Sequence, residues 1–114
     1  SGGGSSGRYR AIVVRLRKLI DAHMTHEKSP AAYASMLSIS EVYLNEAVKA
    51  VTGLSAGAYI RSRIMTQARR QLAYTSLSSK EIAYALGYED YAYFSKLFKK
   101  QMGKSPSEYR KNLK

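Results

Sequence analysis

Apolar residues recur along this chain at the three- and four-residue spacing of an α-helix, interrupted by short polar breaks. Between residues 8 and 26 the apolar positions are Tyr9, Ile12, Val13, Leu16, Leu19 and Ile20. The helical spacing continues through residues 29–37, 40–53, 55–74, 78–87, 90–103 and from 105 onward. The pattern therefore predicts an all-α chain of several short helices and one longer helix.

Start and stop signals support these boundaries. Ser29-Pro30 and Ser105-Pro106 each place a serine N-cap before a proline at the first helical position. A glutamate stands three residues after Ser78 and after Ser105, which is the pattern of a capping box. Glycines, which tolerate the left-handed conformation common at helix ends, follow three of the predicted helices, at Gly53, Gly87 and Gly103.

A helix, a turn, a second helix and a terminal glycine occur twice in the chain. Ala34, Leu37 and Ile39 precede Ala83, Leu86 and Tyr88 by 49 positions. Leu44, Val48, Gly53, Ser55 and Tyr59 precede Phe94, Phe98, Gly103, Ser105 and Tyr109 by 50. The shift of one position falls in the turn, where an insertion disturbs least. Two short helices joined by a turn match the helix-turn-helix plan for reading DNA.

The second copy carries a long motif at fixed spacing. Its positions are Ala83, Leu86, Gly87, Tyr88, Phe94, Lys96, Phe98, Lys99, Lys100, Gly103, Ser105, Pro106, Tyr109 and Arg110. This motif resembles the C-terminal signature of AraC/XylS-type bacterial transcription regulators. The resemblance implies two homeodomain-like helix-turn-helix units joined by a long central helix. It also implies binding to double-stranded DNA and activation of transcription through contact with RNA polymerase.

The segment between the two copies reads as one helix over residues 55–74. About nineteen residues at roughly 1.5 Å each give a length of about 28 Å, and successive major grooves on one side of DNA lie about 34 Å apart. We therefore expect a first unit over about 8–54, a connecting helix over about 55–74 and a second unit over about 75–114. Residues 1–7 have the composition of a flexible linker or a remnant of cloning.

Charge and composition narrow the partners. The 19 lysines and arginines against 8 acidic residues give a net charge of +11 on 114 residues. Such a field favours nucleic acid first and an anionic membrane second. The chain contains no cysteine, which suits the bacterial cytoplasm, where we expect it at the nucleoid. No apolar run approaches about 18 residues, so no membrane partner is expected.

In the second unit, the apolar stripe of Phe94, Leu97 and Phe98 sets the opposite face of the helix toward DNA. The predicted base-reading residues there are Ala92, Ser95, Lys96 and Lys99, with Tyr91 and Tyr93 near the helix start. Lys96 suits a guanine edge, and Ala92 suits a thymine methyl group. A solvated charged face is the alternative for the lysines, and packing is the alternative for the tyrosines.

In the first unit, burial of Leu44 and Val48 turns Val42, Asn45, Glu46 and Lys49 outward. The resemblance implies base contacts at positions 42, 45 and 46. Asn45 suits adenine, and Glu46 can accept a hydrogen bond from a cytosine amine. Family members often carry a basic residue where this chain has Glu46.

Phosphate contacts are predicted at two kinds of place. Helix starts offer backbone N–H donors at Pro30-Ala31 and at Ser79-Lys80. The connecting helix offers Arg61 and Arg63, with Arg69 and Arg70 further along. Arginine stems that cover a packed face are the alternative for these four side chains.

The chain offers no Ser/His/Asp set, Gly-rich phosphate loop or convincing carboxylate pair, so we expect neither enzyme activity nor a cofactor. His23 and His26 have a spacing that can bind metal, but without a third ligand a solvated or capping role is expected. Two alternatives remain open: a nonspecific nucleic-acid packaging protein, and a helical module for an acidic protein or membrane. Family members commonly carry an upstream ligand-sensing or dimerisation domain, for which this chain has no room.

Overall fold

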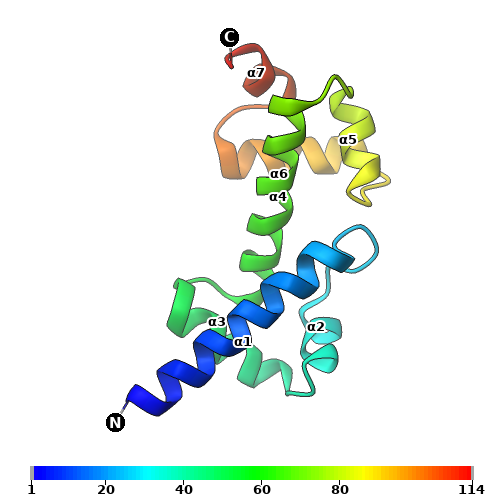
Figure 1. Ribbon diagram of the computed structural model, residues 1–114. Helices are drawn as coiled ribbons and strands as arrows, with labels where there is room; N and C mark the ends of the chain where they lie inside the picture. The colour runs from blue at the N-terminus through cyan, green and yellow to red at the C-terminus, as the bar shows by residue number, and fades with distance from the viewer. Residues whose placement is uncertain (1, 114) are drawn as a thin grey trace. The chain divides into compact units, whose positions relative to one another are not determined.

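The computed structural model describes residues 2–113, and of residues 2–6 the backbone only. Within that range the chain folds into helices alone (Figure 1): α1 (Gly2–His23), α2 (Pro30–Met36), α3 (Glu41–Thr52), α4 (Ala56–Tyr74), α5 (Ser79–Ala85), α6 (Tyr91–Met102) and α7 (Pro106–Lys111). The all-α prediction is confirmed. The chain divides into two compact units, the first ending at Arg63 and the second beginning at Ile64, so the boundary falls inside α4.

The first unit is held together by α1, which packs against α3 and α2. Its core side chains are Ile12, Val13, Leu16, Ile20, Tyr33, Ala34, Leu44, Ala47 and Val48, all of which are buried. Each fully buried large apolar side chain contributes about 1.5–3 kcal/mol relative to exposure. Burial of Leu44 and Val48 fixes the rotation of α3 about its own axis, and with it the face that α3 leaves in solvent.

The second unit is built around aromatic rings. Phe94 and Phe98 of α6 are fully buried, and their ring centroids lie 6.1 Å apart. Tyr88 packs on Phe94 at 5.2 Å, and Tyr109 of α7 meets Phe98 edge-on at 5.6 Å. Ring pairs at these separations add to the stabilisation from area burial. The rings therefore hold α6 between the turn that precedes it and α7.

Polar side chains cap the helices as the start signals predicted. Ser78 and Ser105 form complete capping boxes with Glu81 and Glu108. The hydrogen bond from the backbone N–H of the capping serine, 2.9 Å at Ser78 and 3.1 Å at Ser105, is the main cause that lowers the pKa of each glutamate. Asp90 caps α6 by accepting from the N–H of Tyr93 at 3.3 Å.

The same turn joins the two short helices in both units. The N–H of Ile39 donates to the carbonyl of Ala34 at 3.0 Å, and that of Tyr88 donates to Ala83 at 2.9 Å. The residue before the donor has a positive φ in each case, Ser38 at 59° and Gly87 at 89°. The 49-residue correspondence before the turn is thus matched by equivalent backbone hydrogen bonds.

The bounds of α1 differ from the expected residues 8–26. The helix begins at Gly2 rather than near Arg8. It ends at His23, after which the N–H of Glu27 still donates to the carbonyl of His23 at 2.8 Å. The assignment of residues 1–7 to a linker or cloning remnant stays a prediction.

Arg110 of α7 is bound to the end of α4. Its Nε donates to the carbonyl of Leu72 at 3.1 Å, and its Nη2 donates to that of Thr75 at 3.2 Å. The last turn of α4 has no basic residue of its own. The guanidinium therefore supplies the positive charge that the C-terminal end of a helix favours, and it fixes α7 beside α4.

Candidate nucleic-acid interface

The exposed face of α6 carries the predicted reading residues of the second unit. Ala92, Lys96 and Lys99 are exposed, on the side of α6 away from Phe94 and Phe98. Ser95 is half-buried at the edge of this face. Since the buried rings fix the rotation of the helix, the two lysines are presented on a surface that is otherwise small or polar.

The two tyrosines at the start of α6 are placed differently. Tyr91 is half-buried, and its hydroxyl lies 2.9 Å from that of Ser79 at the start of α5. Its ring centroid is 6.3 Å from that of Phe94. Tyr93 is exposed and its ring lies 6.3 Å from that of Tyr88. Tyr91 therefore links α6 to α5, whereas Tyr93 lies on the surface.

The exposed face of α3 carries Val42, Glu46 and Lys49. The side chain of Val42 is 70% exposed. The hydroxyl of Tyr9 in α1 lies 3.5 Å from Oε2 of Glu46, and the Tyr9 ring packs on Tyr43 at 5.6 Å. Burial raises the pKa of Tyr9, and the Glu46 carboxylate raises it further.

The side-chain amide of Asn45 is hydrogen-bonded within the first unit. The residue is half-buried, its Oδ1 accepts from the N–H of Ala56 at 2.8 Å, and its Nδ2 donates to the carbonyl of Glu41 at 3.3 Å. Ala56 is the first residue of α4, so its N–H has no partner within that helix. The expected outward orientation of Asn45 is therefore not what the structure shows, because its amide caps α4.

In the second unit, the first residue of the helix that follows α6 needs no amide to accept a hydrogen bond from its N–H. The counterpart of Ala56 is Pro106, which has no N–H to satisfy, and the counterpart of Asn45 is Ser95. With no donor at that place, a shorter side chain suffices. The base-reading prediction for this position therefore applies to Ser95 more directly than to Asn45.

The predicted phosphate residues are distributed over both units. Ala31, Arg61 and Lys80 are exposed, and so are Arg69 and Arg70, whereas Pro30 and Ser79 are half-buried. Arg63 is engaged: its Nη2 lies 3.5 Å from Oδ1 of Asp21, its side chain is only 16% exposed, and its Nε is buried without a hydrogen-bond partner. Arg63 thus joins α4 to α1 within the first unit.

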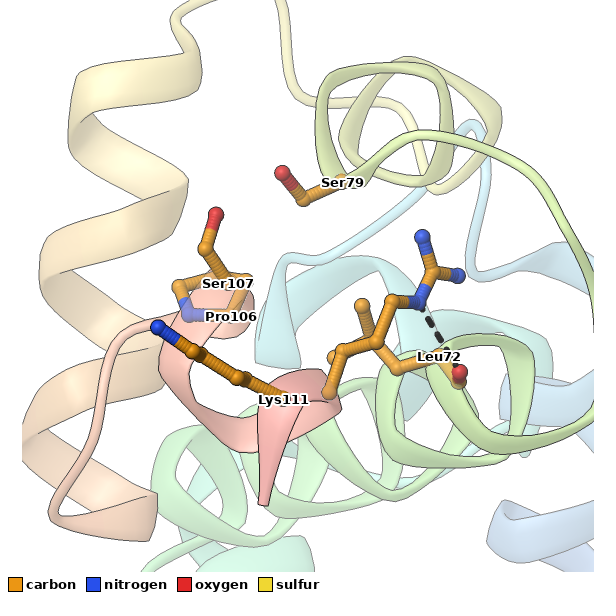
Figure 2. Close-up of a pocket in the computed structure, with 6 residues that line it drawn as sticks. Leu72, Ser79, Pro106, Ser107 and Lys111 are labelled. Atoms are coloured by element: carbon orange, nitrogen blue, oxygen red, sulfur yellow. Dashed lines mark hydrogen bonds between the residues drawn. The ribbon is translucent and has the colours of Figure 1, made fainter. Parts of the chain in front are cut away.

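A pocket of about 330 Å³ lies in the second unit, where the end of α4, the start of α5 and α7 meet. Figure 2 shows the lining side chains around this space: Leu72, Ser79, Pro106, Ser107, Arg110 and Lys111. The sequence pattern did not single out Ser107 and Lys111. The signal was nonetheless present, since the 50-residue offset maps Arg61 onto Lys111.

Two features of the described residues bear on other chemistry. Within residues 2–113 no helix is both long enough and apolar enough to cross a lipid bilayer. In the same part of the chain, no three side chains of the metal-ligating types gather in one place, and His23 and His26 have no acidic neighbour that would complete such a group.

The pairs of short helices α2–α3 and α5–α6, each joined by the same turn, have the plan of helix-turn-helix DNA-binding modules. The family model described as "Helix-turn-helix domain" matches residues 33–112. The regulatory protein SoxS of Escherichia coli is 31% identical over 105 residues, which cover 92% of this chain and 98% of SoxS. The chain belongs to the AraC/XylS-type family of DNA-binding transcription regulators, which are not enzymes.

Two further proteins show how the chain relates to longer regulators. The Msm operon regulatory protein of Streptococcus mutans is 32% identical over 109 residues, which cover 96% of this chain and 39% of that protein. The solved C-terminal domain of AraT, a response regulator from Geobacillus stearothermophilus, has a TM-score of 0.81 and 36% identity, covering 89% of this chain and 84% of that one. The chain thus spans about two fifths of the Msm regulator.

Proposed function

We propose that this chain recognises a specific duplex DNA sequence by placing α3 and α6 in two successive major grooves, and that it thereby controls transcription. The observation that carries the proposal is the face of α6, where Lys96, Lys99 and Ala92 are exposed above a buried pair of phenylalanines. An exposed helix face of this kind, the second of a helix-turn-helix pair, fits the major groove.

The two units contribute different chemistry to this proposal. In the second unit Lys96 and Lys99 supply both attraction to DNA and a donor for guanine, with Ser95 and Ala92 beside them. In the first unit Val42 offers an apolar contact for a thymine methyl, Glu46 accepts from cytosine, and Lys49 supplies positive charge. Asn45 and Tyr91 are assigned to positioning the two reading helices, because their polar groups are bound within the fold.

Phosphate contacts position the protein, and we assign them to the exposed side chain of Arg61, to Lys80, and to the helix starts at Pro30-Ala31 and Ser79. Arg63 is assigned to the ion pair with Asp21 instead. The family supports activation through RNA polymerase as the consequence of binding, and bacterial relatives support a place at the nucleoid in the cytoplasm.

Binding of matched variants tests the proposal. Lys96→Ala should weaken binding to a preferred duplex by about 1–3 kcal/mol and change random DNA less, since a base contact carries sequence information. Arg61→Ala should weaken both duplexes alike, because phosphates are present in every sequence. Affinities measured by fluorescence anisotropy at one fixed salt concentration would decide between these patterns.

The net charge of +11 favours one competing function, which is nonspecific packaging of nucleic acid. A packaging protein would bind preferred and random duplexes equally, and its affinity would follow salt alone. Equal losses on both duplexes for Lys96→Ala would contradict the reading role and support packaging.

A further inference from the structure

The pocket in the second unit has a counterpart in the first. Ser79, Ser107 and Lys111 line the pocket, and the internal offsets of 49 and 50 residues map them onto Pro30, Gly57 and Arg61. These three also converge in space: a Cβ added at Gly57 would lie 3.4 Å from Nη1 of Arg61 and 3.7 Å from Cγ of Pro30. Each unit therefore brings a cation to the same place in its fold.

The chemistry of the pocket favours an anion. Lys111 brings an ammonium group, Ser79 and Ser107 bring hydroxyls, and none of the six lining residues carries a carboxylate. The acidic residue of α7, Glu108, lies outside the lining and is occupied by the Ser105 N–H. A compact ammonium with neighbouring hydroxyl donors is a suitable environment for a phosphate group.

The apolar part of the lining favours a phosphate that belongs to a nucleic acid. Leu72 and Pro106 both add apolar surface to the lining, beside the polar groups. A free anion gains no stabilisation from such a surface, whereas the carbon atoms of a deoxyribose can pack on it. Arg110 also lines the pocket, but its guanidinium is bound to the carbonyls of Leu72 and Thr75, so it fixes the wall.

We propose that Lys111, with Ser79 and Ser107, binds one backbone phosphate of duplex DNA, and that Arg61 beside Pro30 and Gly57 binds the equivalent phosphate in the first unit. This inference rests on the proposed function and extends the interface of the second unit to α7.

The first measurement compares the salt dependence of Lys111→Gln with that of wild type. Loss of one phosphate contact should reduce the slope of log K against log salt by about 0.9. Lys104→Gln is the matched control, because it removes the same charge from an exposed lysine that precedes α7 and does not line the pocket. Its slope should stay close to that of wild type, and circular dichroism melts should show that both variants fold.

The second measurement locates the contact. Single phosphates of the duplex are replaced in turn by neutral methylphosphonates, and binding of wild type, Lys111→Gln and Arg61→Gln is measured on each duplex. One substitution should weaken wild type but leave Lys111→Gln unchanged, and a different one should do the same for Arg61→Gln. Such coupling cannot arise from net charge alone.

Two outcomes would overturn the proposal. One is a Lys111→Gln variant that behaves like Lys104→Gln and is coupled to no phosphate. The other is the same lack of coupling together with Lys111 resonances that move on addition of inorganic phosphate, which would assign the pocket to a free anion. Neither outcome would affect the test with Lys96→Ala, so failure here is distinguishable from failure of the proposed function.

Discussion

The turn between the two helices of each unit contains a residue with positive φ, Ser38 at 59° in the first and Gly87 at 89° in the second. A residue with a Cβ is disfavoured by roughly 1–2 kcal/mol in this left-handed conformation, whereas glycine adopts it readily. The two units therefore use the same turn with different amounts of backbone strain, and the first unit is the strained one.

Exchange of these residues should change stability in opposite directions. Gly87→Ala should lower the free energy of unfolding by about 1–2 kcal/mol. Ser38→Gly should raise it by about 0.5–1 kcal/mol, because relief of strain exceeds the entropy that glycine adds to the unfolded chain. Urea unfolding monitored by circular dichroism would measure both changes. A loss of stability in Ser38→Gly would show that the serine makes a compensating contact.

Tyr33 gives the first unit a response to alkaline pH. The side chain is fully buried, and its hydroxyl donates to the carbonyl of Glu27 at 2.7 Å. Burial is the main cause that raises the pKa of Tyr33 from 10.0 to about 12, with a smaller contribution from the Glu27 carboxylate. The neutral phenol is therefore the form that the folded chain favours.

The sign of the pH dependence follows from this raised pKa. The stabilisation is fully present below pH 10, the ordinary pKa of tyrosine, and is lost as the pH rises toward 12. Tyr33→Phe should therefore show a shallower fall in unfolding free energy over this range, measured by urea titrations at several pH values. Tyr74→Phe, which removes a hydroxyl that is exposed in the folded chain, is the control. An identical fall in wild type and Tyr33→Phe would contradict the assignment.

At the scale of the elements, each unit must satisfy the start of the helix that follows its reading helix. The first unit does so with the amide of Asn45, and the second does so with Pro106. Either solution leaves no unpaired N–H at the first residue of that helix, and an unpaired buried donor would cost about 1–3 kcal/mol. The reading helix α3 is in this way tied directly to the first residue of α4.

The loss of stability on removing the hydrogen bond between Asn45 and Ala56 should depend on whether residue 56 has an N–H group. Asn45→Ala should lower the free energy of unfolding by about 1 kcal/mol, whereas Asn45→Asp keeps the acceptor and should lower it less. In a chain that also carries Ala56→Pro, which removes the donor as in the second unit, Asn45→Ala should cost little. Thermal unfolding of the four variants would measure this coupling, and equal losses in both backgrounds would exclude the capping role.

The elements themselves were largely predictable from the sequence. The predicted starts at Ser29, Ser40, Ser78 and Ser105 are N-caps in the structure, and Gly53 and Gly103 are C-caps with φ of 80°. These features depend on residues close together in the chain, so local pattern suffices. The start of α1 was not predicted, because residues 1–7 have no apolar pattern.

At the scale of the whole molecule, two similar units on one chain allow a prediction about DNA rather than about the protein. Enrichment of bound duplexes from a random pool at roughly physiological salt should recover two short motifs about 10 base pairs apart. The physical reason is that each unit carries its own proposed reading helix, and α4 continues from one unit into the other. Recovery of one motif alone would mean that the unit containing Glu46 only steadies the complex.

Apart from the bounds of α1, the sequence by itself determined the helices, their caps, the duplicated plan and the family, because each is encoded in spacing along the chain. It also identified the exposed faces of α3 and α6 apart from Asn45 and Ser95, which are half-buried, since burial of one stripe fixes the opposite one. Tertiary structure decided which polar groups remain available. The amide of Asn45 accepts from the first N–H of α4, Arg63 pairs with Asp21, and the hydroxyl of Tyr91 lies beside that of Ser79. The fold also places Lys111 in the same pocket lining as Ser79 and Ser107. These outcomes depend on contacts between residues far apart in the chain, which local periodicity does not encode.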